Sequence, residues 1–464
     1  MSGSKIIKDA IHGHIEIPAL CVRIMDTPQF QRLRFLKQLG TASFVYPAAS
    51  HNRFEHCLGT CYLAGKMVEA LRSRQADLGI TEKDVLCVQI AGLCHDLGHG
   101  AFSHVFETFM KESKKSFKHE KMSCRMFDDI MKNFGAEGLD EEDVQFIKDL
   151  ILGKKPSQEN GRPAEKAFLF EIVNNKRTGV DVDKWDYILR DCHGLGLNVT
   201  FEYERLIHFS KVAKVEDEWQ IVFKEAEAEN LYEMNHARML LHKKAYQHRV
   251  VKIIDRMLVD ALLKADEFVR YTGENGRSLK LSEVCTDPVA YTHLTDDVIH
   301  RILRRKDSDL VEAKEILNNI LTRKIYTYVD EVKEITEKEE SEIKRLGGMS
   351  LKRKITFGSK KGNPLEEQHF YRRGDPNTYV TLKAEQVSRM LPKEFKDVNY
   401  YIVAKEECDA QRIREFLDVH VKPRSAYLSP CKPPTDDTNS VKHFTIRLKH
   451  YSTCDAVDGR RTGT

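Results

Sequence analysis

The sequence lacks several features that define whole classes of protein. Its 11 cysteines are odd in number and contain no CxxC pair, which indicates thiols in a reducing compartment rather than a secreted disulfide framework. Its most apolar stretch, residues 85–94, is too short to span a bilayer and contains Gln89. The first four residues are small and polar, so we expect no signal peptide. Secreted and membrane proteins are therefore disfavoured, and an intracellular location is expected.

An excess of charge of either sign is also lacking. The 74 Lys and Arg residues nearly balance the 71 Asp and Glu residues, which leaves a formal net charge of +3. This balance argues against a nucleic-acid coat protein but allows a local basic site. The chain of 464 residues is long enough to bury a substantial core without disulfides. Histidine, in contrast, is plentiful, because four of the 19 lie within 25 residues: His95, His99, His104 and His119.

Hydrophobic periodicity and capping patterns predict a mostly helical first part of the chain. Helices are expected at residues 52–74 and after the capping-box pattern that starts at Thr81. A helix that starts after Thr27 is expected to end at Gly40, and one long helix is expected over residues 231–269.

Beyond about residue 330 the sequence changes to charged segments and β-rich runs, such as residues 379–382 and 400–403. We therefore predict a mainly α fold with two parts. Residues 1–340 are expected to form a helical core, and residues 341–464 a smaller α+β lobe with a flexible tail.

The most informative motif is the dipeptide His95-Asp96, which lies at the expected end of a helix. A neutral imidazole and a carboxylate provide the nitrogen and oxygen ligands that suit Fe, Mn or Zn. His56 and Asp183 are candidates for further ligands, since ligands on separate helices can converge inside a bundle. The residues alone leave two interpretations open, a metal site and a chance grouping of histidines.

The ordered set His56, His95-Asp96 and Asp183 resembles the H…HD…D signature of HD-domain metal-dependent phosphohydrolases. Four longer strings narrow the resemblance to the sterile-alpha-motif and HD-domain deoxynucleoside triphosphate triphosphohydrolases: residues 50–56, 90–100, 181–187 and 245–248. The similarity runs from about residue 5 to about residue 450, and this sequence contains no sterile alpha motif. It implies an HD-domain helical core with a divalent metal (Fe, Zn or Mn), Mg that bridges the nucleotide phosphates, and hydrolysis of dNTPs to deoxynucleoside and inorganic triphosphate.

The resemblance also implies roles for individual residues. His104 matches the proposed general acid, and Glu107 stands where the family has an aspartate, so that the carboxylate is retained with a different reach. The implied catalytic set is Arg53, His99, His104, Glu107 and His119, and the implied metal ligands are His56, His95, Asp96 and Asp183. The implied substrate-binding set is Gln38, Leu39, Arg53, Lys184, Tyr187, Asp191, Arg238, Tyr246 and Gln247.

Allosteric activation is a further implication of the resemblance. GTP or dGTP and dNTPs are expected to activate the enzyme by assembling monomers or dimers into a homotetramer. Lys8 stands where the family has asparagine, and Ala226 where it has a phosphate-binding lysine, so activator preference is expected to differ. The implied effector-binding set is Lys5, Ile6, Asp26, Gln31, Arg34, Val45, Arg205, Phe209, Asn230, Lys244, His248, Arg249 and Arg323.

The family further implies control of cellular dNTP pools, antiviral restriction, a location in the nucleus or cytosol, and weak binding of single-stranded nucleic acid at most. No membrane partner is expected. Two other functions stay open. One is an HD phosphodiesterase or ribonucleotide hydrolase with a dinuclear site that uses His99 or His119, and the other is a non-catalytic scaffold that binds nucleotides or nucleic acid. The complete ligand set argues against the scaffold.

Overall fold

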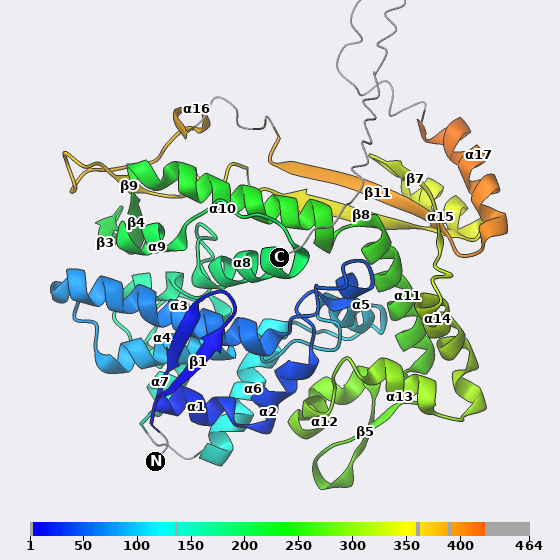
Figure 1. Ribbon diagram of the computed structural model, residues 1–464, viewed down its shortest axis with the longest axis horizontal. Coiled ribbons are helices and arrows are strands. Elements are labelled where there is room, and N and C mark those ends of the chain that lie inside the picture. Colours follow the sequence, from blue (N-terminus) through cyan, green and yellow to red (C-terminus); the bar gives the residue numbers. More distant parts are fainter. Residues whose placement is uncertain (1–2, 135–137, 359–361, 388–391, 393, 423–464) are drawn as a thin grey trace, which may run out of the picture.

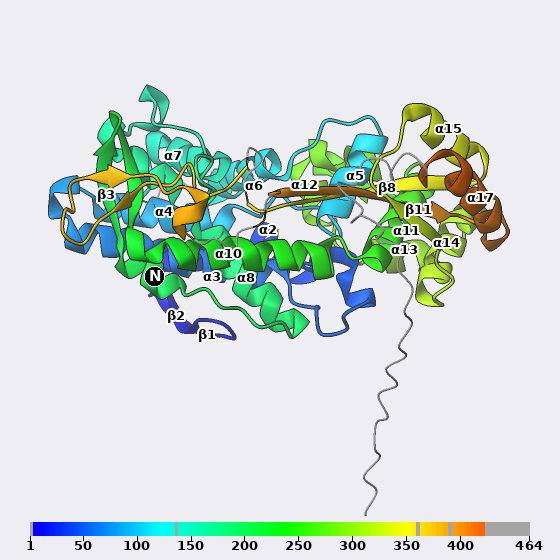
Figure 2. The ribbon, with the colours of Figure 1, turned by 90° about the horizontal axis from the view of Figure 1, so that it is seen from above.

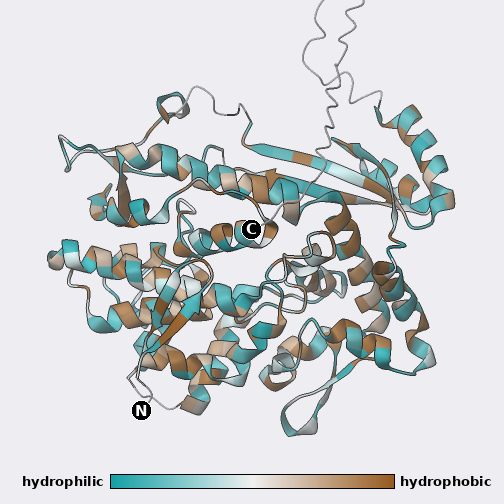
Figure 3. Ribbon diagram, viewed as in Figure 1, coloured by the Kyte–Doolittle hydropathy of each residue, from teal (hydrophilic) through white to brown (hydrophobic). Residues whose placement is uncertain are grey.

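The computed structural model describes residues 3–134, 138–358, 362–387, 392 and 394–422 (Figure 1). The fold is mainly α with small sheets, as predicted. Hydrophilic and hydrophobic residues are mixed along the helices (Figure 3). The helices are α1 (Ala19–Met25), α2 (Pro28–Gln31), α3 (Arg53–Arg74), α4 (Glu82–Cys94), α5 (His104–Glu112), α6 (His119–Phe134), α7 (Glu141–Leu152), α8 (Val182–Leu195), α9 (Tyr203–His208), α10 (Ala228–Leu241), α11 (Arg249–Ala265), α12 (Pro288–Thr292), α13 (Val298–Arg304), α14 (Val311–Leu321), α15 (Glu337–Arg345), α16 (Ala384–Val387) and α17 (Ala410–His420).

The strands form four small sheets. β1 pairs with β2, β3 with β4, β5 with β6, and β11 lies between β7 and β8. β9 pairs in parallel with β4 and antiparallel with β10, which brings a C-terminal segment back onto the helical core. Their bounds are β1 (Lys5–Asp9), β2 (Gly13–Ile17), β3 (Ser210–Val215), β4 (Glu218–Lys224), β5 (Arg270–Thr272), β6 (Ser278–Lys280), β7 (Thr327–Val332), β8 (Gly348–Thr356), β9 (Phe370–Tyr371), β10 (Tyr379–Val380) and β11 (Lys396–Ala404).

Helices α3 and α4 pack against each other, and both begin where capping residues predict. Asn52 and Glu55 form a capping box at the start of α3, as Thr81 and Asp84 do at α4. The two helices pack closely at Gly92, where an added Cβ would lie 3.0 Å from the carbonyl oxygen of Thr60. This close packing brings the C-terminal end of α4 against the N-terminal half of α3.

Two predicted helices are wrong in extent. The helix after Thr27 ends within two turns: α2 has four residues and continues as a 3-10 turn, after which Leu36 is extended. Gly40 starts another 3-10 turn instead of ending the helix. Tertiary contacts explain the change, because the buried Arg32 guanidinium donates to the carbonyl oxygens of Leu294 (2.7 Å) and His99 (2.6 Å).

The long helix predicted over residues 231–269 is interrupted. α10 ends at Leu241, a π-helical turn spans His242–Tyr246, and α11 begins at Arg249. The extra residue in the π turn shifts the helical phase, which directs the Tyr246 hydroxyl onto Asp191 (2.5 Å).

The C-terminal lobe has its own small core. Side chains from β7, β11, α15 and α17 pack together, and they include Val329, Ile343, Ile402 and Leu417. Strand β7 precedes residue 340 and contributes Val329 to this core, and the domain boundary near residue 340 stays a prediction. The lobe lies at one end of the elongated molecule, opposite β3 and β4 (Figure 2). The predicted tail, from residue 431 onward, lies outside the described residues.

The nine cysteines that the structure describes are free thiols, and seven of them are buried. Burial raises the pKa of the Cys57 and Cys94 thiols well above its usual range, which keeps them protonated. Among the helices of the described residues, none combines the length and the apolar character needed to cross a bilayer.

Candidate active site

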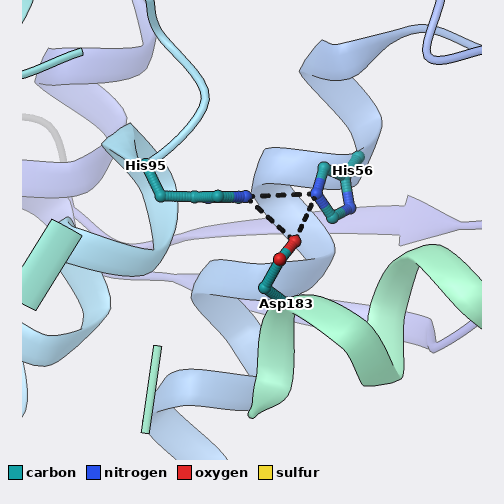
Figure 4. Close-up of side chains that lie close together, drawn as sticks. All are labelled: His56, His95 and Asp183. Carbon is teal, nitrogen blue, oxygen red and sulfur yellow. Dashed lines mark hydrogen bonds and ion pairs between the residues drawn. The ribbon is translucent and has the colours of Figure 1, made fainter. Parts of the chain in front are cut away.

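Three side chains from three helices converge on one small space (Figure 4). His56 comes from α3, His95 follows α4, and Asp183 lies in the first turn of α8. Nε2 of His56 and Nε2 of His95 are 3.2 Å apart, and Oδ1 of Asp183 lies 3.1 Å and 3.2 Å from them. The structure thus brings together three residues that the sequence places far apart.

Hydrogen bonds fix the two imidazoles with Nε2 toward this space. Nδ1 of His56 lies 2.7 Å from Oδ2 of Asp186, and Nδ1 of His95 lies 2.8 Å from the carbonyl oxygen of Gly92. Because both partners are acceptors, Nδ1 is the donor in each ring, and Nε2 is the nitrogen that the neutral imidazole would offer to a metal. Asp186 was not among the predicted site residues, although its spacing of three from Asp183 on α8 places both on one helical face.

Asp96 adds a second carboxylate. Its oxygens lie 3.7 Å from Nε2 of His56 and 3.6 Å from Nε2 of His95, and it also bonds the guanidinium of Arg53. Burial opposes its ionisation, but Arg53 and His95 outweigh burial and hold the pKa of Asp96 well below its usual range. Two imidazole nitrogens and two ionised carboxylates fit a divalent cation of the Fe, Mn or Zn class.

The protonation of His56 supports this fit. Burial lowers its pKa, but the hydrogen bonds to Asp183 and Asp186 outweigh burial and raise the pKa of His56 to about 10. The surrounding carboxylates therefore favour a positive charge at this place, and a divalent cation would provide that charge without the proton.

A second histidine group lies next to this centre. Asp96, His99 and His119 offer ligand atoms within 4.8 Å of one another, and the rings of His99 and His119 stack at 4.0 Å. Burial and the nearby Arg53 hold the pKa of His99 well below its usual range. Burial also disfavours charge on His119, but Glu107 outweighs it and raises the pKa of His119.

Glu107 connects two of these histidines. Its Oε1 lies 2.5 Å from Nδ1 of His119, and its Oε2 lies 3.4 Å from Nδ1 of His104. His104 is largely solvent-exposed, with 75% of its side chain accessible. The Glu107 carboxylate therefore contacts both imidazoles. The sequence alone did not show whether a glutamate at this position would contact His104.

His56, Asp96 and Asp183 line a cavity of about 840 Å³. Strand β8 contributes Ser350, Leu351 and Lys352 to its wall, a contribution of the small lobe that the sequence did not indicate. Lys184 is not part of the lining, because its Nζ bonds Asp181 at 2.9 Å. The other predicted substrate-binding residues all line the cavity: Gln38, Leu39, Arg53, Tyr187, Asp191, Arg238, Tyr246 and Gln247.

Asp191 lies at the centre of a polar group in the wall. Its Oδ1 is 2.7 Å from Nε2 of His51, and its Oδ2 accepts from the hydroxyl of Tyr246. Nearby, burial and Arg238 lower the pKa of His242 to about 3, so its imidazole is neutral at physiological pH. Among the described residues, Oε1 of Gln38 is a buried acceptor without a hydrogen-bond partner.

Gln247 faces the small lobe. Its Oε1 accepts from the backbone N–H of Lys354 at 2.8 Å, and its Nε2 donates to the carbonyl oxygen of the same residue at 2.7 Å. Both polar atoms of the amide therefore bond the backbone of β8. Gln247 thus connects the cavity wall to the small lobe.

The predicted effector residues form separate groups of contacts. Arg205 and Asn230 both bond the buried Glu227, and the Arg205 guanidinium lies 5.2 Å from the ring centre of Phe209. Arg34 donates to Gln31 at 2.8 Å. Asp26 is exposed and ends α1, and β1 carries Lys5 and Ile6.

A third group surrounds the end of the π turn. Tyr46 donates its hydroxyl to the carbonyl oxygen of Lys244 and packs against His248, with ring centres 5.9 Å apart. Arg323 donates to the carbonyl oxygen of Phe44 at 2.8 Å. Val45 lies between Phe44 and Tyr46 in the sequence, and Arg249 follows His248.

Comparison with known proteins agrees with the geometry. The HD domain family matches residues 53–172. The deoxynucleoside triphosphate triphosphohydrolase SAMHD1 of Homo sapiens is 44% identical over 432 residues, which cover 85% of this chain and 69% of the human protein. The chain belongs to the SAMHD1 family. The SAMHD1 protein of Danio rerio is 41% identical over 444 residues, covering 87% and 71% of the two chains. The SAMHD1 homolog of Dictyostelium discoideum is 40% identical over 437 residues, covering 90% and 81%.

Similarity to SAMHD1 extends well beyond the HD match. The HD match includes His56, His95 and Asp96 but ends before Asp183 on α8. The SAMHD1 alignments cover most of the chain. Membership of the SAMHD1 family therefore rests on far more sequence than the HD motif.

Proposed function

We propose that this chain hydrolyses dNTPs, releasing deoxynucleoside and inorganic triphosphate in a metal-dependent reaction. The observation that carries the proposal is the convergence of His56, His95 and Asp183 beside a cavity large enough for a nucleotide. The names of the SAMHD1 relatives specify the substrate class.

The metal ligands are His56, His95, Asp96 and Asp183. A divalent ion held there supplies a Lewis acid that acidifies water and polarises a phosphoryl oxygen. Mg²⁺ accompanies the nucleotide phosphates. The chain provides the cationic contacts, with Arg53 and Arg238 in the cavity wall and Lys184 beside it. Burial disfavours charge on Lys184, but Asp181 outweighs burial and raises the pKa of the ammonium, which stays charged.

The leaving 5′ oxygen requires a proton. His104 lines the cavity and provides it, while Glu107 holds both His104 and His119. His99 packs against both rings and stays neutral.

Replacing Glu107 by glutamine tests this arrangement. Glu107 joins the proton donor His104 to His119 and raises the pKa of His119, so its loss breaks this link and the protonated form of His119 disappears at a lower pH. We expect kcat to fall by about 10²-fold at pH 8, and the decline on the alkaline side of the pH–rate profile to begin at lower pH than in the wild type. Profiles measured from pH 6 to 9 that superimpose would contradict the role of Glu107.

Other residues of the cavity wall bind the sugar and base. Asp191 and Gln38 offer acceptors to the 3′-hydroxyl, and Leu39 and Tyr246 pack against the ring. Tyr246 is fixed by its bond to Asp191, so a tightly packed sugar edge disfavours a 2′-hydroxyl.

Nucleotide activators control the reaction. GTP or dGTP contacts Asp26, Gln31 and Arg34, and Lys5 contacts its phosphates. dNTPs occupy a neighbouring site, and both sites lie between subunits of a homotetramer. The residues of the dNTP site are Val45, Arg205, Phe209, Asn230, His248 and Arg249. Within one chain Arg205 bonds Glu227 and Arg323 bonds Phe44, and contact between such groups of two subunits would complete each site. Lys8 and Ala226 change two of the matched positions, which alters activator preference. In the cell this activity lowers dNTP pools and thereby restricts viruses.

Replacing Asp26 by alanine should weaken the assembly that GTP induces. The carboxylate accepts from guanine N1–H and N2–H, and its loss costs about 1–3 kcal/mol of recognition. Sedimentation velocity with and without GTP measures the effect, with the exposed Asp217→Ala variant as the control. Metal content should stay unchanged, and GTP-dependent tetramers of unchanged stability would refute the assignment.

A second candidate function is a dinuclear HD phosphodiesterase, which the group Asp96, His99 and His119 favours. The cationic guanidinium of Arg53 bonded to Asp96 opposes a second cation there. Metal stoichiometry and product analysis distinguish the two functions, since a phosphodiesterase releases nucleoside monophosphate or pyrophosphate.

The decisive experiment incubates the protein with dGTP alone, and with dATP in the presence and absence of GTP. Release of inorganic triphosphate with dGTP, and with dATP only when GTP is present, is the expected result. Triphosphate release from dATP alone would refute GTP activation, and the absence of triphosphate under all three conditions would refute the proposed reaction.

A further inference from the structure

The turn of the β1–β2 hairpin reaches into the helical core. Oδ1 of Asp9 accepts from the backbone N–H groups of Ile11 and His12, each at 2.8 Å, and Asp9 pairs with Gly13 across the hairpin. These bonds fix the turn and the position of His12. Although the hairpin lies on the surface, the His12 side chain is completely buried.

The His12 ring is held by an aspartate and two tyrosines. Its Nε2 lies 2.7 Å from Oδ1 of Asp186, and its Nδ1 lies 3.4 Å from the hydroxyl of Tyr203. The ring of Tyr62 packs at 5.7 Å. Because the carboxylate is an acceptor, Nε2 of His12 carries the proton and donates to Asp186.

Asp186 transmits this contact to a metal ligand. Its Oδ2 accepts from Nδ1 of His56 (2.7 Å) and from Nε of Arg190 (2.8 Å), and its Oδ1 accepts from His12 and from a terminal nitrogen of Arg190 (2.7 Å). With four donors around one buried carboxylate, Asp186 cannot rotate without breaking a hydrogen bond. Gly59 on α3 leaves the space, because a Cβ there would lie 1.8 Å from Oδ1.

Arg190 connects the hairpin to the same carboxylate a second time. One of its terminal nitrogens donates to Oδ2 of Asp9 at 3.0 Å, while its Nε and its other terminal nitrogen donate to Asp186. The hairpin turn therefore bonds Asp186 directly through His12 and indirectly through Asp9 and Arg190.

We propose that His12 is a positioning residue for the metal ligand His56. By fixing Asp186, it orients Nε2 of His56 toward the metal and thereby sets the metal affinity. The proposal rests on the metal site of the proposed function. Because β1 also carries Lys5, the strand assigned to activator binding is bonded, through its turn, to the partner of a metal ligand.

The test measures Mn²⁺ binding to the metal-stripped full chain by equilibrium dialysis. We expect His12→Ala to weaken Mn²⁺ binding by about tenfold, as loss of an outer hydrogen-bond partner does. His12→Gln should retain most of the affinity, because its amide N–H replaces Nε2–H as donor to Asp186. The control is His14→Ala, which removes an exposed histidine of the same hairpin and should bind as the wild type does.

Wild-type affinity in folded His12→Ala would overturn the proposal, and so would an equal loss in the alanine and glutamine variants, which would indicate packing alone. If the alanine variant does not fold, His12→Asn decides, because its shorter amide does not reach Asp186; affinity equal to that of the glutamine variant would then overturn the proposal. The His56→Ala variant distinguishes failure of the His12 proposal from failure of the metal site on which it rests. Unchanged Mn²⁺ binding in that variant would refute the metal site itself, whatever His12 does.

Discussion

Replacing Asp183 by alanine is expected to abolish dNTP hydrolysis and to lower the bound metal at the same time. Oδ1 of Asp183 lies 3.1 Å and 3.2 Å from the Nε2 atoms of His56 and His95, so its loss opens the ligand set. Loss of an outer partner of a ligand costs about 10–100-fold in metal affinity or activity. Loss of the ligand itself should therefore lower kcat by more than about 100-fold. Triphosphate release and metal content, measured by elemental analysis, are the readouts.

The matched control is Glu204→Ala. Glu204 is also a helix-borne carboxylate, but it is exposed and pairs with Lys66 on the surface at 3.1 Å. Its loss should leave both kcat and metal content unchanged. If the Asp183 variant kept its metal and its activity, the ligand set would be wrong.

The helices that carry or precede the proposed metal ligands could be predicted from sequence because their starts are clear. Asn52 caps the helix of His56 and Thr81 the helix that precedes His95, and both caps are visible as residue patterns. The residues that orient the ligands could not be predicted. The bond from His56 to Asp186, and the choice of Nδ1 over Nε2, depend on how α3 packs against α8.

The cavity wall shows the same limit. The apolar period over residues 231–269 contains no glycine or proline at the break, so the sequence favours one helix where the structure has a π turn. The turn directs Tyr246 to Asp191, and the next residue, Gln247, bonds the backbone of β8. Both contacts join segments far apart in sequence, and local propensity contains no information about them.

Arg53 has two roles in the proposed site: it pairs with Asp96, and it contacts the substrate phosphate. Its guanidinium bonds Asp96 and donates from Nε to the hydroxyl of Ser103 at 2.9 Å, and only 4% of its side chain is exposed. It therefore neutralises a buried carboxylate, which stabilises the folded protein. It also lines the cavity, where it contacts phosphate in the proposed reaction.

Replacing Arg53 by alanine should lower both stability and activity, and the loss of stability should depend on whether metal is bound. Without metal, Asp96 loses its counter-charge, and the free energy of unfolding should fall by roughly 3–5 kcal/mol. A bound cation supplies positive charge to Asp96, so the loss should be smaller in metal-loaded protein, while kcat/KM still falls by about 10²–10³-fold because a phosphate contact is missing. Urea unfolding with and without Mn²⁺, together with triphosphate release, measures the two effects. Arg72→Ala on the same helix is the control, since it breaks only surface pairs with Glu69 and Glu82. An equal loss of stability in both metal states would show that Asp96 does not face the metal.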